Sequence, residues 1–134
     1  MLFRSAALAN KKYGRFSVSL QTDGDLMYAP GVLWTAAHHR IPLLSVMLNN
    51  RGYHQEIMHV QRMCNQRNRG IDRGTMGSML TDPNIDFAKV AQGMGLHGEG
   101  PITDPKDLGP ALRRAIAAVK RGEPALVDVV TQAR

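Results

Sequence analysis

Two short polar stretches, each placed directly after an apolar run, constrain the fold of this chain more than any other feature of its sequence. The first is Thr22-Asp23-Gly24-Asp25, and the second is Asn49-Asn50-Arg51-Gly52. The apolar runs before them, 16–20 and 43–48, are typical of buried parallel strands. Because the segment 30–39 between them has helical character, we predict a strand–helix–strand unit with two parallel strands and a right-handed crossover.

Oxygen ligands follow both predicted strands: Asp23 after the first and Asn50 after the second. Since the carboxyl ends of parallel strands meet at the edge where open α/β sheets bind ligands, we expect this carboxylate and this amide to lie close together. Hard oxygen ligands suit Mg²⁺, which keeps coordination places for phosphate oxygens and water. The pattern therefore predicts a magnesium–diphosphate site.

Helices and strands are expected to alternate along the rest of the chain. We predict a short helix over 5–12, a polar helix from the region of Gly52 to about Arg67, and a long loop over 69–83. A loop of that length is usually either functional or disordered, and both alternatives stay open here. The basic residues of this region could bind an anionic substrate or a partner subunit.

The C-terminal half carries signals for two further helices. Asp86 fits the N-cap of one, and Asp104 fits the N-cap of the last helix, with Pro105 in its first position. Gly109-Pro110 predicts a kinked or separate first turn in that last helix. A short strand near 96–97 and a buried strand over 125–130 complete an α/β, doubly wound, three-layer domain with a mainly parallel sheet, which spans 1–134 as a single domain.

Three residues of the predicted helix 30–39 require separate assignment. Trp34 shares an apolar stripe with Leu33 and Ala37, so we predict that its side chain lies in the core. His38 and His39 are adjacent and point in different directions, which makes them a poor metal pair. We expect both to lie at the surface or in packing at the helix end.

Composition limits the class of protein. The 43% hydrophobic and 21% charged content is ordinary for a globular chain, and no apolar run approaches the roughly 20 residues of a membrane span. Cys64 is the single cysteine, so no intrachain disulfide can form, and we expect a cytoplasmic protein. The net charge of +6 indicates a solvated basic surface, and one aromatic residue in the arginine-rich region is a weak signal for nucleic-acid binding.

At the two polar stretches the chain resembles the thiamine diphosphate-dependent enzymes related to acetolactate synthase and benzoylformate decarboxylase. Their fingerprint begins with Gly-Asp-Gly or similar and ends downstream in Asn-Asn. Placing Thr22-Asp23-Gly24 on its start brings Asn50 onto the second asparagine without a gap. The same register aligns Leu33-Trp34-Thr35-Ala36-Ala37 and Ile41-Pro42 with similar residues of benzoylformate decarboxylase-like sequences, whereas an alternative register would use Gly24-Asp25-Leu26.

The resemblance implies a site for thiamine diphosphate and Mg²⁺. The metal ligands would be Asp23, Asn50 and the backbone carbonyl of Gly52. The residues implied to bind the cofactor are Thr22, Asp23, Gly24, Asp25, Asn50, Gly52, Tyr53 and His54. For His54 an exposed position at a helix start is an equal alternative. Thr22 replaces the family's first glycine, and Asp25 would repel phosphate unless its carboxylate points away.

The resemblance also implies the cofactor-anchoring domain of an enzyme that makes or breaks C–C bonds of 2-oxo acids, acetolactate synthase-like or decarboxylase-like. Expected partners are the 2-oxo acid and a pyrimidine-binding domain of the same or a partner subunit, within a homo-oligomer and without membrane or nucleic acid. The family's activating glutamate lies on that other domain, so no catalytic residue is assigned in this chain.

A segment that is glycine-rich in the relatives precedes their first helix, whereas only Met1 to Arg4 precede it here. The resemblance therefore implies an N-terminally truncated domain, inactive in isolation. Two alternatives stay open: a non-catalytic protein that binds thiamine diphosphate or a partner, and a basic nucleic-acid-binding α/β module.

Overall fold

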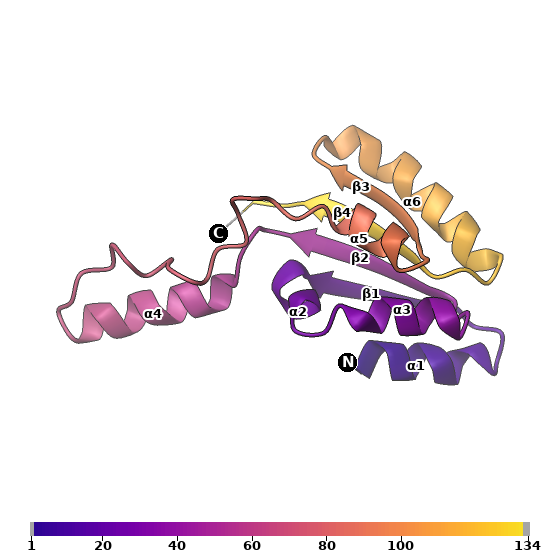
Figure 1. Cartoon of the computed structure of the whole chain (residues 1–134), viewed down its shortest axis with the longest axis horizontal. Coiled ribbons are helices and arrows are strands. Elements are labelled where there is room, and N and C mark those ends of the chain that lie inside the picture. Colours follow the sequence, from indigo (N-terminus) through magenta and orange to yellow (C-terminus); the bar gives the residue numbers. More distant parts are fainter. Residues whose placement is uncertain (1, 133–134) are drawn as a thin grey trace.

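The computed structural model describes residues 2–132, and it describes side chains from residue 5 onward. Its centre is a four-stranded sheet in the order β1-β2-β4-β3, in which every neighbouring pair is parallel. The strands are β1 (Ser17–Thr22), β2 (Leu43–Asn49), β3 (His97–Ile102) and β4 (Ala125–Val130). Figure 1 shows the strands side by side with helices around them. The predicted α/β class with a parallel sheet is confirmed.

Six helices connect or flank the strands in the described part of the chain. They are α1 (Leu2–Lys11), α2 (Asp23–Met27), α3 (Gly31–His38), α4 (His54–Gln66), α5 (Phe87–Gly93) and α6 (Pro105–Lys120). The five-residue α2 was not predicted, and β3 is longer than the short strand expected near 96–97. No described helix has the length and apolar character needed to cross a membrane.

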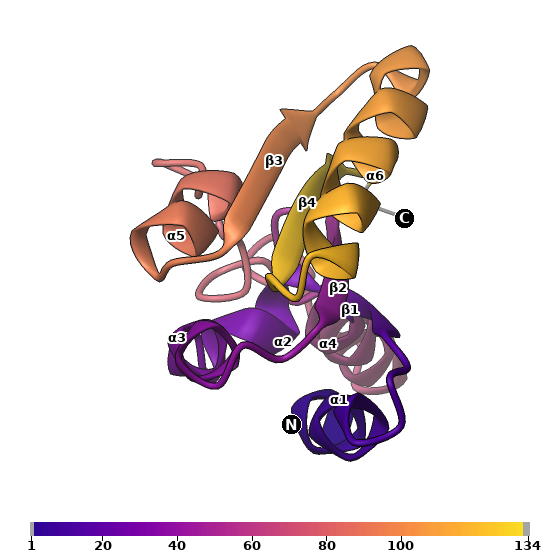
Figure 2. The same cartoon turned by 90° about the vertical axis from the view of Figure 1, so that its right-hand side faces the viewer.

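Two apolar cores lie on opposite faces of the sheet. Figure 2 shows α3 and α5 on one side of the sheet and α6 on the other. On one face α3 and α5 pack against Met47 and Leu126, with Phe87 among the largest buried side chains. On the other face the alanines of α6 pack against Leu44 and Val127. Small residues let α6 approach the sheet closely, and helices on both faces make the expected three layers.

The two predicted N-caps of the C-terminal half are present. The Asp86 side chain accepts a hydrogen bond from the Lys89 backbone N–H at 2.9 Å, and Asp104 accepts one from Lys106 at 2.9 Å. The predicted break at Gly109-Pro110 is absent, because α6 continues through Pro110 as one helix. Pro110 is the sixth residue of α6, so the helix loses the one hydrogen bond that an N–H at this position would donate to the carbonyl of residue 106.

The apolar side chains of β1, and Phe16 directly before it, are exposed, in contrast to the prediction of a buried strand. Phe16, Val18 and Leu20 are 44%, 55% and 73% exposed. The register pairs Val18 with Leu44 on β2, so these residues share the sheet face covered by α6. Because α6 packs on β2, β3 and β4 and β1 is an edge strand, α6 leaves Val18 and Leu20 uncovered.

Trp34 is also exposed, at 56%, and the prediction that it belongs to the core is wrong. Its neighbour Leu33 takes the buried position on α3, while the indole ring stacks on the ring of His38 with centroids 4.9 Å apart. A helix of eight residues buries a narrow face, and here Val32, Leu33 and Ala36 fill it. His38 and His39 lie exposed at the end of α3, as predicted.

One part of the chain extends away from the sheet. Helix α4 and the segment that follows it form an arm, residues 54–78, which projects from the end of β2 in Figure 1. The helix buries only Ile57. The arm closes at its base, where the Tyr53 N–H donates to the Ser78 carbonyl at 2.8 Å and Gly52 bridges to Met79.

Candidate functional site

The carboxyl ends of β1 and β2 bring together the two residues predicted as ligands. Asp23 is the first residue of α2 and is fully buried. Its Oδ2 accepts a hydrogen bond from the Gly52 N–H at 3.1 Å, and Asn50 Oδ1 accepts from the same N–H at 3.2 Å. The three predicted metal ligands are therefore in contact, because the side chains of Asp23 and Asn50 both accept from the Gly52 N–H.

The second carboxylate oxygen of Asp23 is the unusual atom of this site. Oδ1 is buried and has no hydrogen-bond partner among the residues described. A buried carboxylate oxygen without a partner is costly, so it marks a position that a cation or another donor would stabilise.

Asp25 occupies a different environment, although it is only two residues away. Its side chain is exposed and lines a separate hollow beside Tyr28 and Val32. The structure thus separates the two aspartates, with Asp23 directed at Gly52 and Asp25 in solvent.

Two predicted glycines lie where side chains would collide. A Cβ at Gly24 would lie 2.8 Å from Cδ1 of Tyr53, and a Cβ at Gly52 would lie 2.9 Å from the Ser78 carbonyl oxygen. The Tyr53 ring also packs against the ring of Tyr28, with centroids 5.5 Å apart. The backbone at 24 and the loop at 52 are therefore closely packed around Tyr53.

The loop 49–52 has a tightly bonded backbone. Arg51 has a φ of +62°, a left-handed conformation that side chains other than glycine adopt at some cost. Its N–H donates to Asn49 Oδ1 at 3.2 Å, and its carbonyl accepts from Leu80 N–H at 2.9 Å. The end of the predicted loop 69–83 therefore returns to the site and holds it.

A buried carboxylate supports the loop from behind. Asp128, on β4 and fully buried, accepts from Asn49 Nδ2 at 3.0 Å and from the Phe87 N–H at 3.2 Å. Burial raises the pKa of Asp128, against the opposing effect of those two hydrogen bonds. Sequence reasoning missed this residue, although an aspartate inside the apolar run 125–130 was an available signal.

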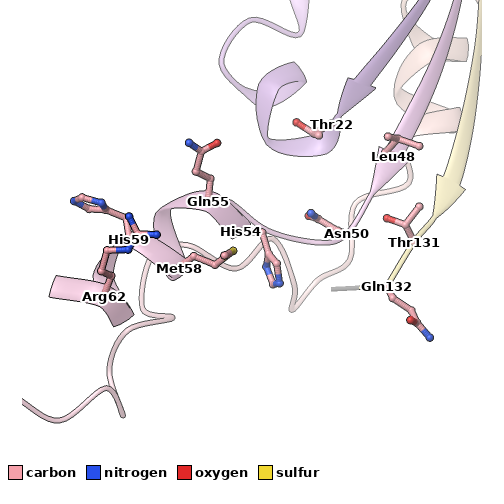
Figure 3. A pocket seen from close by; sticks show the side chains of 10 residues that line it. All are labelled: Thr22, Leu48, Asn50, His54, Gln55, Met58, His59, Arg62, Thr131 and Gln132. Atoms are coloured by element: carbon pink, nitrogen blue, oxygen red, sulfur yellow. The ribbon is translucent and has the colours of Figure 1, made fainter. Parts of the chain in front are cut away.

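A cavity of about 640 Å³ opens beside these residues (Figure 3). Thr22 and Asn50 line it from the strand ends, and His54, His59 and Arg62 line it from α4. The remaining lining residues are Leu48, Gln55, Met58, Thr131 and Gln132. The predicted residues Thr22, Asn50 and His54 thus share one cavity, whereas Tyr53 is packed against Gly24 outside its lining.

The polar groups at this edge do not form a metal centre of the histidine, cysteine and carboxylate type. Across the described side chains, no cluster of three or more such residues could hold an ion. The oxygen donors gathered here are instead one carboxylate, one amide and the backbone.

Open parallel α/β sheets generally bind ligands at the carboxyl ends of their strands, and the buried carboxylate and the amide of this chain lie at that edge. The chain belongs to the thiamine pyrophosphate enzymes: residues 4–129 match the family described as "Thiamine pyrophosphate enzyme, C-terminal TPP binding domain". It is therefore a thiamine diphosphate-binding domain, as the resemblance at the two polar stretches implied.

Individual relatives agree with this assignment. The chain is 33% identical over 114 residues, 83% of its length, to the Mycobacterium tuberculosis protein named "Putative acetolactate synthase large subunit IlvX". It is similar to the thiamine diphosphate-dependent 4-hydroxybenzoylformate decarboxylase of Rhodococcus jostii RHA1, with a TM-score of 0.69 and 26% identity over 87% of the chain. Benzoylformate decarboxylase from Polynucleobacter necessarius shares the fold, with a TM-score of 0.68 and 18% identity over 98% of the chain.

The chain corresponds to only part of each relative. It spans 21% of the M. tuberculosis protein and 20% and 23% of the two decarboxylase chains.

Proposed function

We propose that this domain holds thiamine diphosphate through a Mg²⁺ ion bound by Asp23, Asn50 and the backbone carbonyl of Gly52. The observation that carries the proposal is the buried Oδ1 of Asp23, which has no hydrogen-bond partner among the described residues. Asp23 Oδ2 already accepts from Gly52, so Oδ1 is the oxygen left to bind an ion.

The donor set suits magnesium. Mg²⁺ prefers oxygen ligands, binds proteins through few carboxylates and completes its shell with phosphate oxygens and water. Asn50 Oδ1 accepts one hydrogen bond, from Gly52, and an amide oxygen has a second lone pair for an ion. One carboxylate at the ion leaves positive charge that would attract a diphosphate.

The other predicted cofactor contacts divide into two groups. Gly24 and Tyr53 pack together and would set how closely the backbone approaches the diphosphate. Thr22 and His54 line the cavity beside Asn50, where they would contact the cofactor or the reacting molecule. Asp25 is expected to remain in solvent, so that its charge does not oppose the diphosphate.

We further propose that the domain serves an enzyme that makes or breaks C–C bonds of 2-oxo acids. Thiamine diphosphate supplies a carbanion-stabilising ring for such chemistry, while the protein binds and orients it. The names of the similar proteins, an acetolactate synthase subunit and a 4-hydroxybenzoylformate decarboxylase, support this class. A pyrimidine-binding domain, a homo-oligomeric assembly and a cytoplasmic location belong to the same proposal.

Calorimetric titration of the protein with thiamine diphosphate, with Mg²⁺ or with EDTA, tests the metal site. Binding should require Mg²⁺. Asp23→Ala and Asn50→Ala should each weaken it by about tenfold or more, because each removes an oxygen ligand.

Asp25→Ser is the matched control, since it removes a neighbouring carboxylate that faces solvent. Its affinity should equal or exceed that of the unmodified protein. Loss of binding in Asp25→Ser together with full binding in Asp23→Ala would assign the ligand to Asp25 and reject the proposed site.

A further inference from the structure

We propose that Asp128 and Asn49 form a buried carboxylate–amide pair that positions the loop 49–52 for the ion and the diphosphate. The inference rests on the proposed function, since it concerns the same site. Asp128 touches none of the proposed ligands itself and acts through Asn49, so it is a positioning residue.

Both oxygens of Asp128 are occupied. Oδ1 accepts from Asn49 Nδ2 at 3.0 Å, and Oδ2 accepts from the backbone N–H of Phe87 at 3.2 Å. Asp128 is fully buried and Asn49 is 4% exposed, so water has little access to replace either bond. The carboxylate therefore joins β4, the end of β2 and the start of α5 at one point.

The pair fixes which way the Asn49 amide faces. An ionised carboxylate only accepts hydrogen bonds, so Asn49 must turn its NH₂ group toward Asp128. Its Oδ1 is then directed at the loop, where it accepts from the Arg51 N–H at 3.2 Å. The Asn49 amide thus links the buried carboxylate of Asp128 to the backbone of the loop.

The bond to Arg51 matters because of that residue's conformation. Arg51 adopts a φ of +62°, and a non-glycine residue remains there only when its surroundings hold it. The next residue, Gly52, directs its N–H at Asp23 and Asn50. If Arg51 relaxed, Gly52 would turn and both its N–H and its carbonyl would leave their positions.

A purely structural role for Asp128 makes a different prediction. If the carboxylate only filled the core, Asp128→Asn would be nearly neutral for the loop. In our assignment the introduced amide cannot accept from both Asn49 and Phe87. Either one donor is left unpaired or Asn49 reverses and turns its NH₂ group toward the Arg51 N–H.

Exchanging the two side chains supplies the decisive variant. In Asn49→Asp/Asp128→Asn, the introduced amide can donate to the introduced carboxylate and accept from Phe87. The carboxylate at position 49 then has an oxygen free to accept from Arg51. All three hydrogen bonds are restored, and only the bond between positions 49 and 128 has its donor and acceptor exchanged. By contrast, Asn49→Asp alone places two carboxylates next to each other.

The experiment compares the two single variants, the double variant and Asp86→Ala in the full chain. Asp86→Ala removes the cap at Lys89 beside the Asp128–Phe87 bond, so it controls for loss of stability near α5. Three quantities are measured: hydrogen–deuterium exchange at the amides of Arg51 and Gly52 without ligand, the Mg²⁺-dependent affinity for thiamine diphosphate, and the thermal midpoint.

Each single variant should speed exchange at Arg51 and Gly52 and weaken the affinity by about 10–100-fold. The double variant should return both to near the unmodified values, and Asp86→Ala should lower the midpoint without changing either. Unchanged exchange at Arg51 in folded Asp128→Asn, or a folded double variant without recovery, would overturn the inference.

If Asp128→Asn does not fold, Asn49→Ala replaces it, since alanine has no polar group to join Asp128 to the Arg51 N–H. Unchanged exchange at Arg51 would then overturn the inference. If the unmodified protein binds no thiamine diphosphate, the proposed function fails. Hydrogen–deuterium exchange in the ligand-free variants then tests the role of the Asp128–Asn49 pair independently.

Discussion

Gly24 and Tyr53 come from the ends of different strands and leave no space between them. A Cβ at position 24 would lie 2.8 Å from the Tyr53 ring, and real Cβ atoms do not approach so closely. The ring in turn packs on Tyr28. Even the smallest side chain at position 24 must therefore displace Tyr53, which begins the chain segment leading into α4.

Gly24→Ala should destabilise the fold by about 1–3 kcal/mol, because overpacking forces the tyrosine out of its position. It should also weaken cofactor affinity, since Asp23 is the adjacent residue. Urea unfolding and calorimetry measure the two effects. Gly31→Ala is the control, because a Cβ there meets nothing within 4 Å; it should be neutral or slightly stabilising. Equal stability and cofactor affinity of Gly24→Ala and Gly31→Ala would contradict the close contact between Gly24 and Tyr53.

At the scale of single residues, strand-end chemistry was predictable and long-range pairing was not. Asp23 and Asn50 could be placed together because parallel strands bring their carboxyl ends to one edge. Asp128 pairs with Asn49, which is 79 positions away in the sequence, and no local pattern predicts a contact between residues so far apart. The strand of Asp128 was predicted correctly, but its aspartate was not recognised as a partner of the loop.

Two elements, β3 and α6, are joined by an ion pair at the far edge of the sheet. Arg114 donates to Glu99 through Nε at 2.8 Å and through one terminal nitrogen at 2.7 Å, and His97 lies 3.0 Å from the same carboxylate. The hydrogen bonds from Arg114 hold the pKa of Glu99 below its ordinary value of 4.5, against a smaller opposing effect of burial.

The direction of this shift predicts a pH dependence. A carboxyl whose pKa is lower in the folded protein contributes stability above its unfolded pKa, and that contribution is lost as the pH falls through the folded value. Glu99→Gln should therefore reduce the free energy of unfolding at neutral pH and make it less dependent on pH below about 4.5. Urea unfolding at several pH values measures this free energy. The same pH dependence in Glu99→Gln and in the unmodified protein would contradict the prediction.

Helix α3 and strand β1 show why burial was harder to predict than the elements themselves. Trp34 and Leu33 are both apolar and adjacent, and periodicity alone did not decide which one faces the sheet. Leu20 belongs to a strand that was predicted correctly. Its exposure follows from the position of β1 at the edge of the described sheet, which depends on the order of all four strands.

At the scale of the whole molecule, the open part of the β1–β2 face should drive association. Edge strands with exposed apolar side chains are sites of association. Val18→Thr/Leu20→Thr should reduce self-association measured by sedimentation velocity while keeping strand propensity. The control is Ile71→Thr, because Ile71 is 47% exposed and belongs to the arm, residues 54–78. Figure 1 shows the arm extending away from the sheet. An equal reduction in both variants would place the association elsewhere.

The chain alone should not turn over a 2-oxo acid. It spans about a fifth of its relatives, and the resemblance places the activating glutamate on another domain. Positioning of reacting groups can contribute about 7–11 kcal/mol to lowering a barrier, and an assay of these residues alone leaves out the expected pyrimidine-binding domain. Pyruvate and benzoylformate assays with thiamine diphosphate and Mg²⁺ test it. Turnover by a monodisperse 134-residue chain would refute it.

The arm has a consequence for how this domain tolerates substitutions. Three residues of helix α4, His54, His59 and Arg62, line the cavity, and the helix buries only Ile57. Substitutions along its cavity side therefore meet few packing constraints, whereas the loop 49–52 is fixed by contacts from β4, α2 and the base of the arm. Side chains along α4 can therefore change with little effect on packing, whereas substitutions in the loop 49–52 would disturb the contacts that fix it.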